Sequence, residues 1–585
     1  MSKNIRKRIV IAVALATVCS VNLVSRQSVK VSATGNTVKN VIMLIADGMN
    51  TDALTLARHI NGGTLAMDEI SVGTVQTNWA NGPITDSAPA ATAMSTGNRT
   101  LNKYLGTSVE DIPLATILEA SEQEGKSTGL IATSEIPHAT PAGFSSHTTS
   151  RSRYDDILRQ MINNDLEVVL GGGFNLETDE LTNEMKYRIA NGGYDFIETK
   201  DAMDRYNGDK LWGAFANADM DYDLDRDNTG NNQPSLSEMT SKSLEILNKD
   251  EDGFFLMIEG SKVDWAAHEN AASGMISDII AFDKAVEQAL EFARNREDTV
   301  VIVTTDHGNS GLSIGNYDNT EGTSYEKINQ YKSFTITEEH FNNNILGTLN
   351  LDEKKIRQSV KEYFGLTDLT FEEIEMIKEN KINKVISDRT AIGFTTGGHT
   401  GENVYLGIYT PVSVKKLNGV IDNTRLATYM SELLFGDIDR LNSLSNELYK
   451  NGKESLESLG AKVEIDTTDL QDLKVKVTNK NNEIELKLNT NDYKLNGEEK
   501  SLKSVMPYIY KTDINSGEFY VPQELLDVVS SLTEITIVEI ENKDVVTEVE
   551  EDSKEVITED NKEEITEEVE SNEISEDVEV NDNGL

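Results

Sequence analysis

The chain has 585 residues, more than one compact domain usually holds, so the sequence predicts a large domain with additions. Its formal net charge is −46, and such a surface repels nucleic acid and anionic membranes, which argues against both as partners. It also repels anionic substrates, so an enzyme acting on phosphate would need metal ions or arginine at its site.

The first residues have the pattern of a secretory signal peptide, 1–33. Positive residues precede an apolar run at 9–18, and Val31, Ser32 and Ala33 form a small-residue cleavage site. The run is shorter than the ~20 residues that span a bilayer, so we expect cleavage and a secreted or cell-wall-associated chain without a stable membrane anchor. The only cysteine, Cys19, lies in this segment. Any metal would therefore be held by carboxylate, imidazole and hydroxyl groups.

Residues 38–437 alternate between short apolar runs and helical patterns. Near-continuous Val, Ile and Leu runs predict buried parallel strands, and the stretches 114–124 and 276–295 predict helices. The pattern predicts an α/β domain with a mostly parallel sheet and helices on both faces, in which ligands bind beyond the carboxyl ends of the strands. The predicted strands are 41–45, 128–132, 168–170, 254–258 and 299–304.

Additions to this domain are predicted at four places. Residues 316–392 are polar and partly helical, at 352–364 and 371–383, and we expect an insertion near the mouth of the site. A helical connector, 438–461, precedes a β-rich accessory domain, 462–534, with solvent-facing antiparallel strands. The Glu- and Asp-rich tail, 535–585, should be disordered and solubilising, with divalent-cation capture or wall contact as the alternative.

Two predicted strands end in metal-ligand types. Asp47 and Gly48 follow the run at 41–46, and Asp306 and His307 follow the run at 299–304. A carboxylate beside a neutral imidazole suits Zn²⁺, and a strand end holds its Cα rigidly. The alternatives are an ordinary Asp-Gly turn and a solvated Asp-His pair.

Further ligand candidates lie in two other segments. Glu259 ends a strand, and Asp264 and His268 are spaced i, i+4, so a helix beginning near Asp264 would point both side chains to one side. A helix-face ion pair is the alternative for that spacing. His399 lies among glycines, where an ordinary loop histidine is the alternative.

The candidate nucleophile is Ser87. Small residues from Ser87 onward predict a tightly packed helix that ends at Gly97. The free N–H groups at its start suit a phosphoryl group, although a serine before a helix is more often only an N-cap. A hydroxyl needs a base or a metal to become nucleophilic, and no Gly-x-Ser-x-Gly elbow is present, so the surplus of ligand types points to a metal.

Together these segments resemble the alkaline phosphatase family over about residues 40–437. The most specific piece is Thr85-Asp-Ser-Ala88-Pro-Ala-Ala-Thr-Ala. It is joined, in the family's order, by His138-Ala-Thr140-Pro-Ala, Thr149-Ser150-Arg151, Glu259 with Asp264 and His268, Asp306-His307, and Gly398-His399-Thr-Gly.

The resemblance implies hydrolysis of phosphate monoesters through a phosphoserine on Ser87, and it implies roles for the other residues. Arg151 would bind two phosphate oxygens, and Ala88 would lie beside the nucleophile. One zinc would be held by Asp264, His268 and His399; a second by Asp47, Asp306, His307 and Ser87; and a magnesium by Asp47, Thr140 and Glu259. Dimers are common in the family, which makes a homodimer an expectation.

Two positions vary within the family. This chain has His138 where some bacterial members have Asp, and Trp265 where they have Lys, as in members of Bacillus and cold-adapted type. An imidazole near the third metal implies weaker magnesium binding and activation by added Mg²⁺. Loss of the lysine charge implies weaker phosphate retention.

Two rival functions stay open on the sequence. The first is a related metal enzyme of the same superfamily, such as a phosphodiesterase; the sulfatase motif, a Cys or Ser followed by x-Pro-x-Arg, fails because Pro89 is followed by Ala90 and Ala91 and not by the required arginine. The second is a non-enzymatic acidic surface protein. It draws support from the tail and from the segment 493–522, which resembles the copper amine oxidase N-terminal-like domain of bacterial surface proteins and would imply cell-wall association.

Overall fold

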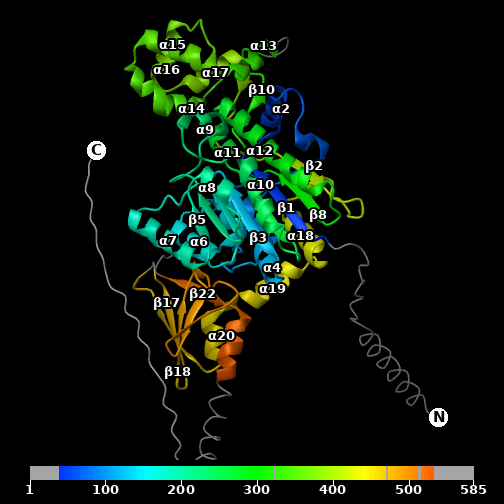
Figure 1. The fold of residues 1–585 in the computed structure, drawn as a ribbon, viewed down its shortest axis with the longest axis vertical. Coiled ribbons are helices and arrows are strands. Elements are labelled where there is room, and N and C mark those ends of the chain that lie inside the picture. The colour runs from blue at the N-terminus through cyan, green and yellow to red at the C-terminus, as the bar shows by residue number, and fades with distance from the viewer. Residues whose placement is uncertain (1–37, 320–324, 470–471, 512–515, 533–585) are drawn as a thin grey trace, which may run out of the picture. The chain divides into compact units, whose positions relative to one another are not determined.

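The computed structural model describes residues 38–319, 325–469, 472–511 and 516–532 (Figure 1). The predicted signal peptide and acidic tail lie outside these residues. No helix in the described part of the chain is both long enough and apolar enough to cross a bilayer.

A ten-stranded sheet forms the centre of the molecule. Neighbouring strands pair in parallel except β13, which runs antiparallel to both β2 and β8, so the prediction of a mostly parallel sheet is confirmed. All residues of β1, β7 and β8 are buried, as continuous apolar runs require. The strand order is β14 (Gly419–Asp422), β2 (Ser71–Gln76), β13 (Val404–Tyr409), β8 (Thr299–Thr304), β1 (Asn40–Ala46), β7 (Phe254–Gly260), β3 (Ser127–Ala132), β4 (Val168–Gly171), β6 (Leu211–Ala214), β5 (Asp195–Ile197).

Helices cover both faces of this sheet, as predicted (Figure 1). Alternate residues of β1 point into two separate cores: Ile42 and Leu44 into one, Val41 and Met43 into the other. The first core contains residues of α2 (Thr51–Ile60), α10 (Leu236–Leu247), α11 (Lys262–His268) and α12 (Ala272–Ala293). The second contains residues of α3 (Ser87–Thr96), α4 (Ile117–Gln123), α5 (Ala139–Ser145), α6 (Tyr154–Ile162), α7 (Asp179–Asn191) and α18 (Thr424–Phe435). Short elements elsewhere are η1 (Ala66–Glu69), α8 (Lys200–Arg205) and α9 (Asp223–Thr229).

The inserted region begins and ends at a two-stranded pairing of β10 (Ser313–Ile314) with β11 (Ile392–Gly393). The helix predicted at 371–383 is wrong as a single element, because the chain forms α16 (Phe371–Lys378) and α17 (Ile382–Thr390). Asn380 lies between them at a φ of 60°, a left-handed conformation that interrupts a helix. The other elements are α13 (Tyr325–Ile328), η2 (Asn329–Ser333), α14 (Glu338–His340), η3 (Phe341–Ile345), η4 (Leu346–Leu349) and α15 (Glu353–Phe364).

After α18 the chain forms α19 (Arg440–Leu448), α20 (Gly452–Ser458) and two small sheets. Alternation along β17 buries Val475 and Val477 and turns lysines outward, which confirms the antiparallel, one-sided strands expected here. One sheet is β15 (Lys450–Asn451), β22 (Gly517–Val521), β21 (Tyr508–Tyr510). The other is β16 (Lys462–Asp466), β17 (Lys474–Asn479), β18 (Asn482–Lys487), β19 (Asp492–Leu495), β20 (Glu498–Ser501).

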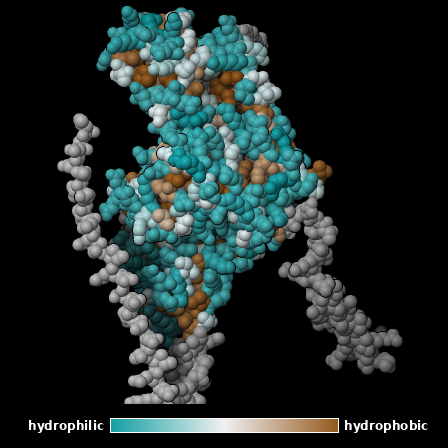
Figure 2. All heavy atoms as spheres, in the orientation of Figure 1, coloured by the Kyte–Doolittle hydropathy of each residue, from teal (hydrophilic) through white to brown (hydrophobic). Residues whose placement is uncertain are grey.

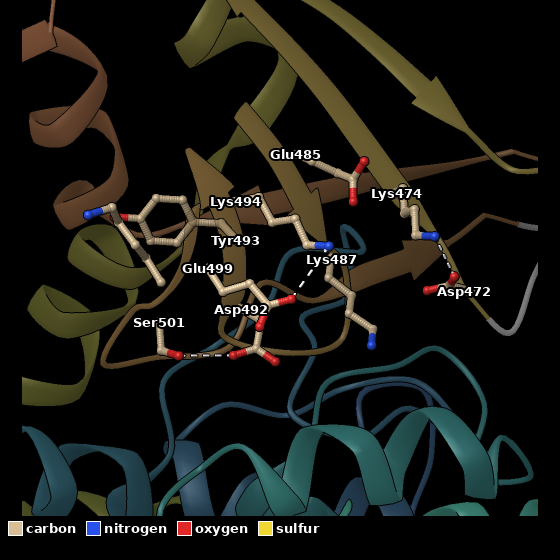
Figure 3. A pocket seen from close by; sticks show the side chains of 10 residues that line it. Asp472, Lys474, Glu485, Lys487, Asp492, Tyr493, Lys494, Glu499 and Ser501 are labelled. Atoms are coloured by element: carbon tan, nitrogen blue, oxygen red, sulfur yellow. Dashed lines mark hydrogen bonds and ion pairs between the residues drawn. The ribbon is translucent and has the colours of Figure 1, made fainter. Parts of the chain in front are cut away.

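The five-stranded sheet carries a hollow of about 340 Å³ on its charged face (Figure 3). Its lining has four lysines and four carboxylates, several of which pair with each other, such as Lys474 with Asp472 at 2.6 Å. The charges therefore compensate one another, and the hollow offers no net charge to an ionic ligand. The face of the molecule shown in Figure 2 is mostly hydrophilic.

Candidate active site

The ends of β1, β7 and β8 bring three ligand candidates to one edge of the sheet. β1 pairs with both other strands, and Ile45 lies opposite Glu259 on one side and Thr304 on the other. Asp47 and Asp306 follow within two residues of those pairs, so their positions are fixed by the backbone hydrogen bonds of the sheet. Both of these side chains and Glu259 are fully or almost fully buried.

Asp47, Asp306 and His307 form a compact group whose ligand atoms lie within 4.8 Å of one another. The distances from His307 Nε2 are 3.1 Å to Asp306 Oδ2 and 3.5 Å to Asp47 Oδ1. Ser87 Oγ lies 3.2 Å from the same nitrogen. The structure therefore brings the predicted nucleophile to the predicted second metal group, although the two segments are 220 residues apart.

The residues predicted to hold the first zinc also lie together. His268 Nε2 is 3.3 Å from Asp264 Oδ2, and His399 Nε2 is 3.8 Å from Asp264 Oδ1. The opposite ring nitrogens contact backbone carbonyls, of Gly397 at 2.9 Å and Thr85 at 2.8 Å. Such contacts orient an imidazole and leave Nε2 for a metal.

Two short strands connect these groups. β12 (His399–Thr400) pairs antiparallel with β9 (Gly308–Asn309), which stacks the rings of His399 and His307 at 3.8 Å between centroids. The compact ligand set around Asp264 accordingly contains His307 and His399, and His268 contacts Asp264 through its other carboxylate oxygen. His307 thus lies between the two groups that the sequence assigned to separate zinc ions.

A third group contains Asp47, Glu259 and His138. Thr140, in the first turn of α5, is fully buried, and its hydroxyl has no partner in the described structure. Both oxygens of Asp47 and of Glu259 are likewise buried, and no hydrogen bond to them is found among the described residues. Buried carboxylates without partners are costly, and bound cations would satisfy them, so the residues present fit the metal ions that the resemblance implies.

Crowding of carboxylates disfavours their charged forms. Burial, and then the charge of Asp264, raise the pKa of Asp47 well above its usual range. Burial also raises the pKa of Glu259 to about 7. At Asp264 burial also acts to raise the pKa, but the hydrogen bond with His268 and the charges of His307, His268 and His399 together lower it. The same hydrogen bond raises the pKa of His268 to about 9. An excess of buried negative charge at one point attracts divalent cations.

Small residues place Ser87 in this group. α3 begins at Ser87 and ends at Gly97 with a φ of 78°, as the sequence predicted. All ten of its residues are buried, and Ala91 packs so closely on α5 that a Cβ at Gly143 would lie 2.6 Å away. Bulky side chains would push α3 outward, so the run of alanines, including Ala88, keeps the hydroxyl next to His307.

Arg151 lies between the nucleophile helix and the third group. Its guanidinium pairs with Asp86, the residue before Ser87, and its Nη2 is 2.9 Å from His138 Nε2. Burial, and then the charge of Arg151, lower the pKa of His138 to about 3, so this imidazole is neutral. The sequence reasoning missed Asp86 as the partner of Arg151.

Trp265 stands at the open side of the site. Its ring is 5.8 Å from that of His138, and Lys262 Nζ lies 4.3 Å from it while pairing with Asp219. The sequence reasoning also missed Lys262, which is 2% exposed, although a lysine just after a buried strand is a signal that could have found it. A hollow of about 400 Å³ is lined by Trp265, His268, Glu269, Glu339, Asn342, Asn343 and Asn383.

A hydroxyl held among buried carboxylates and imidazoles at the ends of parallel strands, with an arginine fork beside it, defines a metal-dependent phosphohydrolase. The family model for alkaline phosphatase matches residues 38–435. The chain belongs to the alkaline phosphatase family, a metal-dependent family, and it is an enzyme that hydrolyses phosphate monoesters.

The chain is similar to known proteins over about two thirds of its length. Alkaline phosphatase 3 of Bacillus subtilis is 35% identical over 414 residues, which cover 67% of this chain and 87% of the relative. The crystal structure of the cold-active alkaline phosphatase of a psychrophilic Shewanella has a TM-score of 0.61 at 29% identity and covers 68% of this chain and 99% of its own. A His-to-Asp variant of TAB5 alkaline phosphatase, solved with Mg bound in the M3 site, has a TM-score of 0.51 at 26% identity and covers 68% and 98%.

Proposed function

We propose that the chain hydrolyses phosphate monoesters through a covalent phosphoserine on Ser87, assisted by two zinc ions and one magnesium ion. The observation that carries this proposal is the position of Ser87 Oγ, 3.2 Å from His307 Nε2 at the edge of the group formed with Asp47 and Asp306. A serine hydroxyl in that position has ligand groups on one side and a helix N-terminus on the other.

The ligand chemistry supports this choice of metals. Mixed imidazole and carboxylate groups suit zinc, and a group of hydroxyl and carboxylate oxygens suits magnesium. One zinc would be held by Asp264, His268 and His399; the other by Asp47, Asp306, His307 and Ser87; magnesium by Asp47, Thr140 and Glu259. Bound cations would supply Lewis acidity that lowers the pKa of the serine hydroxyl and stabilises charge on the phosphoryl oxygens.

The side chains then carry out two displacements at phosphorus. Ser87 Oγ attacks, a P–O bond to serine forms, the ester P–O bond breaks, and the alcohol leaves with a proton. Water attacks the phosphoserine in the second step, which restores the hydroxyl and releases inorganic phosphate. Arg151 would hold two non-bridging oxygens through both steps, with Asp86 keeping its guanidinium in plane.

Replacing the nucleophile tests the proposal. Ser87→Ala should lower turnover of p-nitrophenyl phosphate at alkaline pH by about a thousandfold or more, because no other hydroxyl can take its place. After incubation with labelled phosphate, acid quenching should recover phosphoserine from the native enzyme and not from Ser87→Ala. Ser95→Ala is the matched control, since Ser95 lies on the same helix and its hydroxyl donates to the backbone carbonyls of Gly143 at 2.6 Å and Thr92 at 3.3 Å. Turnover by Ser87→Ala near the native rate would overturn the proposal. The non-enzymatic rival predicts that this substitution changes nothing.

The phosphodiesterase rival differs in its preferred substrate. Arg151 and the third ligand group would contact the non-bridging phosphate oxygens, of which a diester has one fewer than a monoester. We therefore expect p-nitrophenyl phosphate to be hydrolysed much faster than its bis-ester, and the reverse order would favour the rival.

Location and partners are part of the proposal. The signal-like sequence at 1–33 supports secretion, the accessory-domain resemblance supports contact with the cell wall, and the family resemblance supports a homodimer. Metal analysis of the purified protein, with measurement of its mass in solution, tests the metals and the dimer together.

A further inference from the structure

The C-terminal sheets contact the segment that carries Arg151. That segment, residues 147–160, runs from the end of α5 through Arg151 into α6. The family model ends at residue 435, before these sheets begin, so their contacts are additions to the matched domain.

Tyr510 of β21 contacts residues on both sides of Arg151. Thr149 Oγ1 donates a hydrogen bond of 2.8 Å to the Tyr510 carbonyl oxygen. The guanidinium of Arg153 lies over the Tyr510 ring, 3.3 Å from its centroid. In the sequence, Arg151 thus lies midway between two residues that Tyr510 contacts.

Asn489, in the turn after β18, makes a second contact with the same segment. Its Nδ2 donates to Asp156 Oδ1 at 2.8 Å, and its Oδ1 accepts from Gln160 Nε2 at 3.2 Å and from the Tyr508 backbone N–H at 3.0 Å. Asn489 is 2% exposed, so water does not compete for these bonds.

The start of the segment is held by the connector. His147 is fully buried, with Nε2 2.8 Å from Glu119 Oε1 and Nδ1 2.7 Å from Gly106 O. The Tyr449 hydroxyl donates to the same Glu119 oxygen at 2.5 Å. Gln160 closes the segment on itself, because it accepts from the His147 N–H at 2.8 Å and donates to the His147 carbonyl at 3.1 Å.

Arg151 itself needs this support. Beyond its pairing with Asp86 and its contact with His138, its backbone N–H donates to Lys103 O at 2.9 Å. A guanidinium that binds two phosphate oxygens must keep its plane and distance, because displacement weakens both hydrogen bonds of the fork and with them the affinity for phosphate. The Tyr510 contacts lie two residues before and two residues after it, and the Asn489 contacts lie farther along the same segment.

We propose that the C-terminal sheets position Arg151 for phosphate, and that Tyr510 and Asn489 are positioning residues of the phosphatase site. The proposal rests on the proposed role of Arg151 in binding phosphate. On this proposal the C-terminal region contributes to phosphate binding and is not an independent surface module.

Replacing Tyr510 tests this in the full-length metal-loaded enzyme. Tyr510→Leu should raise the KM for p-nitrophenyl phosphate and the inhibition constant of inorganic phosphate together, by about three- to tenfold, because the cation–π contact is lost. The kcat should change by less than about twofold, since Ser87 and the metal groups are untouched. Tyr510→Phe keeps the ring and should restore native constants.

Two further variants separate positioning from general destabilisation. Phe519→Leu, in the neighbouring strand β22, should lower the Tm and leave phosphate inhibition unchanged, because Phe519 is buried, pairs with Tyr508 and packs on Gly452. In an Arg151→Ala enzyme, Tyr510→Leu should weaken phosphate inhibition no further, since both changes act through one guanidinium.

Native phosphate inhibition in Tyr510→Leu, an equal weakening in Phe519→Leu, or additive effects with Arg151→Ala would each overturn the inference and leave the phosphatase mechanism standing. Unchanged inhibition in Arg151→Ala alone would instead overturn the assignment of Arg151 to phosphate, and the inference with it.

Discussion

His138 offers nitrogen to a ligand group whose other members offer oxygen. It shares that group with Asp47 and Glu259, and its imidazole is neutral because burial and the charge of Arg151 lower its pKa to about 3. Magnesium takes oxygen ligands in near-octahedral geometry, and a neutral nitrogen adds neither the preferred atom nor a negative charge. The third site should therefore hold magnesium weakly.

His138→Asp should lower the Mg²⁺ concentration for half-maximal activity by about tenfold or more, because it adds a charged oxygen ligand. The measurement is a magnesium titration of activity after selective magnesium removal, with zinc content followed in parallel. His59→Asp makes the same change of charge at a ring that stacks on Tyr325, and it should not move the titration. An unmoved midpoint for His138→Asp would separate His138 from the third site.

The individual ligands were predictable because each stands in a short local pattern. Asp47 and Asp306 directly follow buried strands, and Asp264 and His268 have helical spacing that α11 realises. Asp86 and Lys262 were missed because their partners, Arg151 and Asp219, are distant in sequence. Isolated segments show the ligand types, and only the fold shows that His307 belongs to two of the candidate ligand groups.

At the scale of elements, the inserted helices give the site its outer wall. The hollow beside His268 and Trp265 is lined by two carboxylates and three asparagines, and its lining contains neither Lys nor Arg. Asn342 Oδ1 is buried there without a partner in the described structure. Such a wall can hydrogen-bond the hydroxyl groups of a neutral alcohol, and it repels an alcohol that carries a carboxylate.

Glu269→Gln should therefore raise kcat/KM for phosphate esters of anionic alcohols, with phosphoglycolate as the probe. We expect about a two- to fivefold gain, because two unit charges 4 Å apart in water interact by about 1 kcal/mol. Glycerol phosphate is the internal control and should change little. Glu372→Gln, on the exposed start of α16, is the matched variant. A similar gain on both substrates would show that Glu269 acts on the phosphate and not on the alcohol.

Element types were predictable where the chain is strongly periodic, and connections between elements were not. Continuous apolar runs predicted the strands at 41–45 and 299–304, whereas the partly exposed β2 and β14 have no such run and were not predicted. The sequence of β13 resembles those of the parallel strands, and only its backbone pairing with β2 and β8 shows that it runs antiparallel. The contact of Tyr510 with Thr149 spans 361 residues and leaves no local pattern in the sequence.

At the scale of the whole molecule, net charge and substrate charge have the same sign. The chain carries −46, and a phosphate monoester is a dianion at alkaline pH. Long-range repulsion slows the encounter, whereas Arg151 and the proposed metal ions would attract the substrate only at short range. The two effects have different ranges, so salt can separate them.

Raising the ionic strength from about 0.01 M to 0.15 M shortens the Debye length from about 30 Å to about 8 Å. The long-range repulsion is then screened, while contacts inside the buried site change little. The kcat/KM for p-nitrophenyl phosphate should therefore rise by about two- to fivefold, mainly through a lower KM. Phosphocholine, whose cationic group offsets the phosphate charge, should show a smaller rise in the same titration. A fall in kcat/KM with salt for both substrates would mean that the positive field of the site reaches beyond the acidic surface and already controls the encounter.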